Sequence, residues 1–282
     1  MQIAVRLVAE TPVSLPFSYY DRFGAAVYAA VAAASPSFAD ELHGGKEHRS
    51  RIKLFSFSPL HSRMTEVHRP DPEKRIEGGL VFKGPTFFKL SSPWPELMNR
   101  VGEGLLATGT LRIGSQLLRV TGANLLPPPT FAETMTWRPA KTGSIVTSWS
   151  RKTDNTKLYA FPDTPAEGHA CELLLRTNLV HKWQRLCEVR NDLAATWSGL
   201  APENTRDAFT PDDIAVTFAN SANGDAHHYK TRLHHIKHNP VRSWQTRVKL
   251  TAPPPLQRIA WACGLGEMNS MGFGLVEEVN QS

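Results

Sequence analysis

The chain has 282 residues, of which 41% are hydrophobic and 21% are charged, a composition typical of globular proteins. This balance excludes disordered and collagen-like chains, and the length favours two domains over one. The 32 Lys and Arg residues outnumber the 26 Asp and Glu residues and leave a net charge of +6, so we expect a surface that attracts polyanions such as nucleic acids.

Cysteine usage and hydropathy indicate the compartment. The three cysteines, Cys171, Cys187 and Cys263, form no CxxC pair, which fits a reducing environment better than a secreted disulfide framework. No run of residues approaches the roughly 18 apolar positions of a membrane span, and the N-terminal segment does not have the pattern of a signal peptide. We therefore expect a cytoplasmic protein that does not act at a membrane.

The chain begins with a strand pattern followed by two helix patterns. Residues 2–9 alternate between apolar and polar side chains, which predicts a strand. A helix is predicted from an N-cap at Asp21, and Pro36 prevents it from continuing. Ser35 and Pro36 open a second, short helix that runs through Leu42.

The rest of the first half returns to strands and closes on a third helix and a strand. A strand is predicted over 51–58, and 79–90 is predicted to form a hairpin around a KGPT turn. A helix then runs from Ser92 to a stop at Gly109, and a strand covers 116–126. The inward side chains of that helix are predicted to be Leu97, Val101, Leu105 and Leu106. The order strand, helix, strand, strand, helix, strand is that of a ferredoxin-like unit.

Three consecutive prolines at 127–129 favour an extended connector and predict the boundary between a domain of residues 1–126 and a domain of residues 130–282. In the second half, strands are predicted near 131–136, 144–149, 157–161, 214–219, 227–237, 241–250 and 273–279, and helices near 166–189 and 256–263. This order is compatible with a second ferredoxin-like unit. The predicted fold class is therefore α+β, with tandem ferredoxin-like domains that each place two helices on an antiparallel sheet.

The most distinctive motif is a glycine-rich loop, Gly264-Leu265-Gly266-Glu267-Met268-Asn269-Ser270-Met271-Gly272-Phe273-Gly274, between the last predicted helix and strand. Its glycines permit positive φ and close approach of backbone N–H groups to phosphates. The loop is neither a dinucleotide fingerprint, which follows a strand, nor a Walker loop, which needs GK[ST]. A tight connector without a ligand is the alternative interpretation.

This loop, with GhG, five residues and GhG (h is hydrophobic), resembles the loop of the Cas-six family of CRISPR-associated repeat-processing endoribonucleases, in the RAMP superfamily. The first half is similar to that family in the order and spacing of Leu15-Pro16, Tyr28, Leu42-His43 and Lys53-Leu54-Phe55-Ser56-Phe57-Ser58. The family's five intervening loop residues usually include Lys or Arg, whereas this loop has none. A loop contact with RNA would therefore use backbone N–H groups and Asn269.

The resemblance implies a metal-independent endoribonuclease without a cofactor, located in a prokaryotic cytoplasm. It would bind CRISPR repeat RNA and cleave precursor crRNA within each repeat, which gives 5′-hydroxyl and 2′,3′-cyclic phosphate ends. Other Cas subunits of an effector complex would be further partners. The alternative is a catalytically inactive crRNA-binding subunit built from the same units. An unrelated RNA-binding protein is disfavoured because the RRM aromatic signature is missing.

RNA cleavage by its own 2′-OH needs a base, an acid and positive charge near the phosphate. His43 can transfer a proton near neutral pH, Lys53 supplies a cation and Tyr28 a phenolic donor, so these are the predicted catalytic residues. The predicted RNA-binding residues are Gly264, Gly266, Asn269, Gly272, Gly274, Arg49, Arg51, Arg138, Arg151 and Lys152.

Two further sets of residues allow more than one interpretation. Trp137 and Trp149 lie among the basic residues of the second half and are expected in the core more often than on an RNA-stacking surface. Histidines cluster at positions 227, 228, 234, 235 and 238. Strand parity separates adjacent histidines and no Cys, Asp or Glu completes a ligand set, so we predict an edge hairpin along RNA and no metal site.

Overall fold

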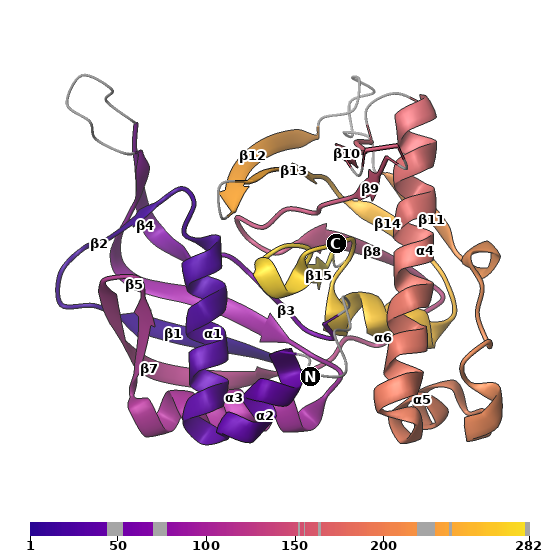
Figure 1. Ribbon diagram of the computed structural model, residues 1–282, viewed down its shortest axis with the longest axis horizontal. Helices are drawn as coiled ribbons and strands as arrows, with labels where there is room; N and C mark the ends of the chain where they lie inside the picture. The colour runs from indigo at the N-terminus through magenta and orange to yellow at the C-terminus, as the bar shows by residue number, and fades with distance from the viewer. Residues whose placement is uncertain are drawn as a thin grey trace.

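The computed structural model shows two large antiparallel sheets side by side, with the glycine-rich loop between them (Figure 1). The structure describes residues 1–43, 53–69, 78–151, 153–154, 156–162, 165–218, 229–236 and 239–279. Within the described residues, none of the helices combines the length and the hydrophobicity that crossing a membrane requires.

The first half forms one sheet around the long strand β5. Its strands are β1 (Gln2–Val8), β2 (Val13–Pro16), β3 (Ser56–Phe57), β4 (His61–His68), β5 (Gly79–Ser91), β6 (Thr110–Ile113) and β7 (Gln116–Leu126). Its helices are α1 (Tyr20–Ala34), α2 (Pro36–His43) and α3 (Pro95–Thr108). The antiparallel order β4-β5-β1-β7 is that of a ferredoxin-like unit, extended by β6 beside β7 and by β2 and β3 on β5.

Helices α1 and α3 pack on this sheet because their apolar side chains recur at helical spacing. Phe23 and Val31 of α1 and Val5 of β1 are fully or almost fully buried in the same core. Helix α3 crosses α1 so closely that a Cβ on Gly104 would collide with the carbonyl oxygen of Ala30. Glycine is therefore required at this crossing.

Four local predictions for the first half are wrong. Residues 79–90 do not form a hairpin but belong to one strand of 13 residues. Within this strand Gly84 has a φ of 78°, and it separates the stretch that pairs with β2 from the stretch that pairs with β1. Leu106 points to solvent with 72% of its surface exposed. Helix α1 begins at Tyr20, so Asp21 lies in its first turn. Of the strand predicted over 51–58, the described residues retain β3 alone.

The second half forms a four-stranded sheet in the order β11-β14-β8-β15. Its strands are β8 (Thr134–Pro139), β11 (Ala215–Phe218), β14 (Val248–Thr251) and β15 (Val276–Glu278), and its helices α4 (Pro165–Val189) and α6 (Pro254–Cys263) share a core with it. The same ferredoxin-like strand order therefore occurs twice, which confirms the predicted fold class.

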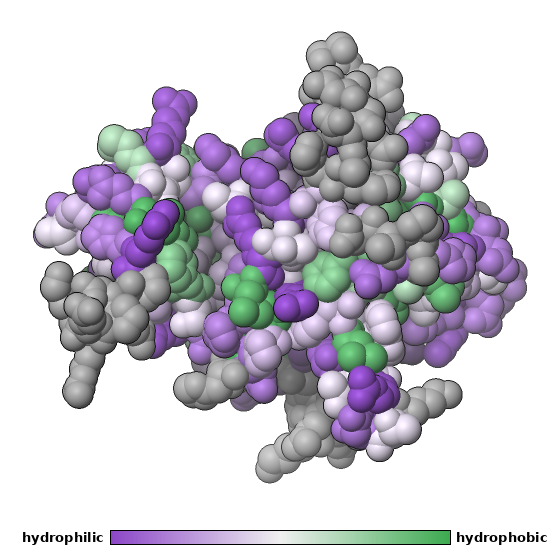
Figure 2. All heavy atoms as spheres, turned by 90° about the horizontal axis from the view of Figure 1, so that it is seen from above, coloured by the Kyte–Doolittle hydropathy of each residue, from purple (hydrophilic) through white to green (hydrophobic). Residues whose placement is uncertain are grey.

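Insertions decorate the second unit. They are the hairpin of β9 (Ser148–Ser150) and β10 (Lys157–Tyr159), helix α5 (Asn191–Ser198), the hairpin of β12 (Lys230–Ile236) and β13 (Asn239–Gln245), and 3₁₀ turns at Pro202–Asn204, Pro211–Asp213 and Asn269–Met271. Seen from the end that carries β12 and β13, hydrophilic side chains spread over the molecule with small hydrophobic groups among them (Figure 2). Such a face suits a polar or charged ligand.

The two units share a packed interface. The rings of Tyr20 on α1 and Phe273 in the glycine-rich loop stack with centroids 5.0 Å apart, and His234 of β12 meets both rings edge-on at 4.9 and 5.1 Å. An ion pair of 2.7 Å joins Lys89 of β5 to Glu277 of β15. The loop is thereby held between the sheets, where both units contribute side chains to its surroundings.

Candidate functional site

The conformation of the glycine-rich loop depends on its glycines. Gly264, Gly266, Gly272 and Gly274 have φ values of 79°, 67°, 94° and 73°, a region that side chains disfavour. A Cβ on Gly272 would lie 2.9 Å from the Tyr20 ring and 3.0 Å from the Phe57 ring, and a Cβ on Gly266 would collide with the carbonyl oxygen of Val146. The loop therefore packs closely against Tyr20 and Phe57 of the first unit and against Val146, which lies just before β9.

Several polar groups of the loop are used within the protein. The N–H groups of Leu265 and Glu267 donate to the carbonyls of Gly274 and Val146, each at 2.8 Å. The side-chain amide of Asn269 is buried and donates to the carbonyls of Leu265 at 3.1 Å and Phe273 at 3.2 Å. RNA contacts by the loop, and by Asn269 in particular, stay a prediction, with the loop's remaining N–H groups as the available donors.

A lysine that the sequence reasoning missed lies beneath the loop. Lys182 of α4 is 1% exposed, and its ammonium donates to the carbonyls of Gly264 at 2.7 Å and Gly266 at 2.8 Å. Burial lowers the pKa of Lys182 to about 7, while Cys263 and Glu267 act in the opposite direction. The available signal in the sequence was a lysine between apolar positions of a helix, with Val180 and Trp183 close to it.

The predicted catalytic Lys53 lies against the last turn of α2. Its ammonium donates to the carbonyl of Leu42 at 2.5 Å, and Leu42 directly precedes His43, the last residue of that helix. Burial lowers the pKa of Lys53, and the positive charge of Arg185 lowers it further. The side chain of His43 lies outside the described residues, but its backbone directly follows Leu42, whose carbonyl accepts the hydrogen bond from Lys53.

Tyr28 connects α1 to the glycine-rich loop. Its half-buried ring meets Phe55 edge-on at 5.7 Å, and its hydroxyl forms a hydrogen bond with the side chain of Ser270. Burial raises the pKa of Tyr28 to about 12, so this hydroxyl keeps its proton at neutral pH and can donate it in a hydrogen bond. Tyr28 thus contacts the loop from the first unit, and Lys53, which bonds to the end of α2, lines a pocket together with residues of the loop.

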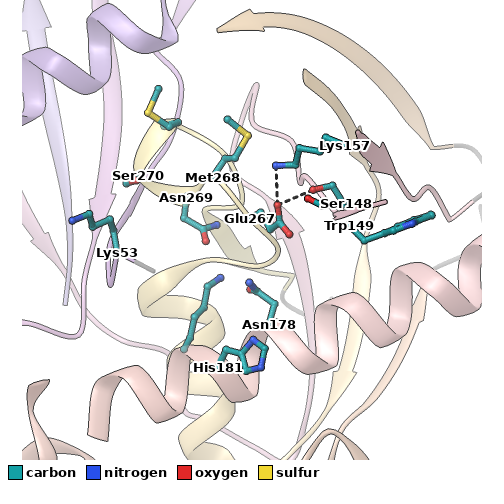
Figure 3. A pocket seen from close by; sticks show the side chains of 13 residues that line it. Lys53, Ser148, Trp149, Lys157, Asn178, His181, Glu267, Met268, Asn269 and Ser270 are labelled. Atoms are coloured by element: carbon teal, nitrogen blue, oxygen red, sulfur yellow. Dashed lines mark hydrogen bonds and ion pairs between the residues drawn. The ribbon is translucent and has the colours of Figure 1, made fainter. Parts of the chain in front are cut away.

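A pocket of about 620 Å³ lies beside this loop (Figure 3). Lys53 and Ser270 lie toward one side of it and Trp149 and Lys157 toward the other, while Asn178 and His181 come from α4. Glu267 accepts a hydrogen bond from Ser148 at 2.8 Å and pairs with Lys157 at 3.1 Å. The lining residues are Lys53, Ser148, Trp149, Ser150, Lys157, Asn178, His181, Lys182, Glu267, Met268, Asn269, Ser270 and Met271.

The two tryptophans have different environments. Trp137 is fully buried, and its indole N–H donates to Gln257 at 2.8 Å, so it belongs to the core. Trp149 is 41% exposed and lines the pocket, where a base could stack on it.

The two predicted arginines that the structure describes lie outside the pocket. Arg138 pairs with Glu277 at 3.2 Å and Arg151 with Asp154 at 3.3 Å, and neither lines the pocket. Arg49, Arg51 and Lys152 lie outside the described residues. Their contacts with RNA stay predictions.

The histidine cluster is divided between different environments. His234 is buried and its Nε2 lies 3.0 Å from the hydroxyl of Ser243, whereas His235 is exposed. Positions 227, 228 and 238 lie outside the described residues. In the part of the chain that the structure describes, no group of three or more His, Cys, Asp or Glu side chains is arranged to hold a metal ion.

Tandem ferredoxin-like units with a glycine-rich loop packed between them form a fold that this chain shares with a solved RAMP protein, 17% identical, at a TM-score of 0.72 with 99% and 100% of the two chains covered. The family model "CRISPR-associated protein Cas6, N-terminal" matches residues 13–123, and the model "CRISPR associated protein Cas6, C-terminal" matches residues 126–278. The chain belongs to the Cas6 family. This confirms the resemblance indicated by the loop and by the landmarks of the first half.

Individual relatives match along their full length. The "CRISPR-associated endoribonuclease Cas6 1" of Methanocaldococcus jannaschii is 24% identical over 280 residues, which cover 99% of this chain and 93% of the relative. A structure of a Cas6-related gene product from Pyrococcus furiosus, 17% identical, superposes with a TM-score of 0.74 and covers 100% of this chain and 99% of its own. A Cas6 product complex, also 17% identical, gives a TM-score of 0.63 with 99% and 98% covered. These structures share the fold.

Proposed function

We propose that this protein is an endoribonuclease that binds CRISPR repeat RNA and cleaves precursor crRNA within each repeat. The observation that carries the proposal is that Tyr28 contacts the glycine-rich loop and that Lys53, which bonds to the end of α2, lines a pocket with residues of this loop. The named activity of the relative from Methanocaldococcus jannaschii and the Cas6 product complex support it. Other Cas subunits are proposed as partners that retain the crRNA.

The proposed reaction is attack of the 2′-OH on the adjacent phosphate. The attacking oxygen forms a new P–O bond, the bond to the 5′-oxygen breaks, and the products end in a 2′,3′-cyclic phosphate and a 5′-hydroxyl. The 2′-OH loses a proton and the 5′-oxygen gains one. His43 transfers the proton at one of these two oxygens, because imidazole can do so near neutral pH, and water exchanges the proton at the other. No metal ion is required for this chemistry.

Lys53 and Tyr28 stabilise the charge that develops on the phosphate. The ammonium of Lys53 uses one proton toward Leu42 and keeps others for a phosphate oxygen. The hydroxyl of Tyr28, whose pKa burial raises to about 12, acts as a hydrogen-bond donor and not as a base. Trp149, exposed at the far side of the pocket from Lys53, offers a stacking surface for a neighbouring base (Figure 3).

The test uses a set of CRISPR repeat RNAs, in excess EDTA. We expect a single cut in each repeat, an upstream product with a cyclic phosphate, and no cleavage when the nucleotide before the cut carries a 2′-deoxy sugar. Cleavage that EDTA stops, with the deoxy substrate still cut, would show a metal-dependent hydrolase. Tight binding without any cleavage would favour the alternative, an inactive crRNA-binding subunit.

A further inference from the structure

The mechanism leaves unexplained why a lysine is fully buried beneath the glycine-rich loop. Lys182 extends from α4 and donates to carbonyls on either side of Leu265, those of Gly264 and Gly266. A buried ammonium is costly unless other groups compensate it, and an uncharged amide could donate to the same two carbonyls without that cost. Packing alone therefore does not account for a lysine here.

The charge of Lys182 is compensated by carbonyl dipoles and not by an acid. Among the described residues, no carboxylate lies within ion-pair distance of its ammonium, and the nearby Glu267 is paired with Lys157 at 3.1 Å. Burial raises the pKa of the Cys263 thiol to about 12, so Cys263 is neutral at physiological pH. The positive charge of Lys182 is thus available to attract an anion.

The loop above Lys182 has no positive charge of its own. Between Gly264 and Gly274 the one ionisable side chain is that of Glu267. Yet Lys182 lines the same pocket as Lys53 and Ser270, which Tyr28 contacts through its hydroxyl. A cation at this position acts through protein of low polarity, where charges interact more strongly than at the surface.

We propose that Lys182 is a positioning residue that supplies, from beneath the glycine-rich loop, the positive charge that the loop's own sequence lacks. It holds the loop through two carbonyls and draws an RNA phosphate to the pocket beside it. The inference rests on the proposed RNA-binding function and adds to it a residue of the second unit that does not touch the reacting atoms.

The charge of Lys182 depends on pH in the physiological range. Because burial lowers its pKa to about 7, the protonated form is lost as the pH rises through that value. A bound phosphate favours the protonated form, so RNA binding takes up a proton and weakens with rising pH. The other titratable and charged groups around the site are Cys263 on α6, Glu267 in the loop, Lys53, Lys157 and His181 along the pocket, and the amino group of Met1, which lies near Cys263.

The experiment compares the wild type with Lys182→Gln, whose amide keeps two N–H donors for the carbonyls but carries no charge. The dissociation constant of repeat RNA with a 2′-deoxy nucleotide before the cut is measured from about pH 6 to about pH 9. We expect Lys182→Gln to bind roughly tenfold more weakly at the acidic end and as tightly as the wild type at the alkaline end. The two proteins differ in this side chain alone, so the difference between their binding curves isolates Lys182.

Lys157→Gln is the matched control because it removes an exposed charge from the same pocket. Its effect on affinity should shrink as salt is added, whereas the effect of Lys182→Gln should persist, because buried charges are screened less. Equal affinity of Lys182→Gln and the wild type at every pH, or one constant ratio between them, would overturn the proposal and leave Lys182 with a structural role.

A second measurement covers the case that Lys182→Gln does not fold. Calorimetry of wild-type RNA binding near neutral pH, in two buffers of different ionisation enthalpy, counts the protons taken up. We expect uptake on binding, and an absence of uptake would overturn the proposal. If the wild type binds no repeat RNA, it is the proposed function that fails, and the two failures are therefore distinguishable.

Discussion

At the scale of single residues, the proposed chemistry depends on side chains with different tasks. His43→Ala removes the proton-transferring group, and we expect single-turnover cleavage of repeat RNA to slow by roughly 10²–10⁴-fold. Binding should change little, because the cation of Lys53 and the loop remain. His169→Ala, an exposed histidine of α4 that does not line the pocket, is the matched control. Wild-type cleavage by His43→Ala would remove His43 from the mechanism.

Tyr28→Phe tests the role of the phenolic proton separately. The variant keeps the ring contact with Phe55 but loses the hydroxyl that bonds to Ser270, so cleavage should slow by roughly 10²-fold. Because the pKa of Tyr28 is raised to about 12, the hydroxyl does not titrate near neutral pH, and the pH–rate profiles of variant and wild type should be parallel. The measurement is the single-turnover rate across pH.

Tyr159→Phe provides the comparison for that variant. The hydroxyl of Tyr159 donates to the carbonyl of Pro240 at 2.8 Å and does not line the pocket of Lys53, so its loss should leave the rate unchanged. A change in the shape of the profile in Tyr28→Phe would mean that Tyr28 acts as an acid or base.

The sequence could predict residues whose role follows from a local pattern and could not predict those that depend on distant contacts. The helical stripe of α1 placed Tyr28 at its border, where it is half buried. Lys182 bonds to carbonyls 82 and 84 residues further along the chain, and nothing in its own helix indicates those partners. The exposure of Leu106 was missed for a similar reason, because periodicity does not show where the sheet beneath a helix ends.

At the scale of elements, the glycine-rich loop is held so tightly that a side chain should affect folding as well as binding. In Gly272→Val the new atoms would meet Tyr20 and Phe57, in a backbone with φ of 94°. We expect a loss of on the order of 2 kcal/mol or more in the free energy of unfolding, measured by denaturant titration. Weaker RNA binding should accompany it.

Gly168→Ala is the control for that substitution. Nothing lies within 4 Å of a Cβ at Gly168, which is in helix α4, so alanine should stabilise the protein by about 0.5–1 kcal/mol. A Gly272→Val protein as stable as the wild type would show that the loop can move away from the first unit.

The elements that the sequence predicted well are those with a complete local pattern. Helix α4 and strand β7 were expected close to their observed bounds, because their apolar positions repeat over many residues. Strand β5 was divided into a hairpin because KGPT has the composition of a turn. Its pairing with β1 and β2 on either side of Gly84 keeps it continuous, and that pairing is not visible in the local sequence.

At the scale of the whole molecule, the interface between the units should weaken in acid. Burial lowers the pKa of His234 to about 4 from its usual 6.5, and the charges of Arg232 and His235 add to this effect. The unfolded chain therefore binds a proton that the folded protein excludes, so stability is complete above about pH 6.5 and is lost as the pH falls toward 4. The expected loss is on the order of 1–3 kcal/mol.

Thermal unfolding of the wild type and of His234→Gln across this range measures the effect. The variant should lose less stability on acidification, whereas His169→Gln, a change at an exposed histidine of α4, should behave as the wild type does. Identical pH dependence in all three proteins would show that His234 is protonated without cost at the interface.

The stacking of Tyr20 on Phe273 also limits how the halves of this protein can be exchanged by recombination. A chimaera joined at the three prolines, with its second half from a relative as distant as 24% identity, would place an unselected side chain against Tyr20 and another against Lys89. Such a hybrid should recover a stable interface when the relative's second half is given Phe and Glu at the positions of Phe273 and Glu277. The two units are therefore coupled in stability through these contacts, although each has the topology of a complete fold.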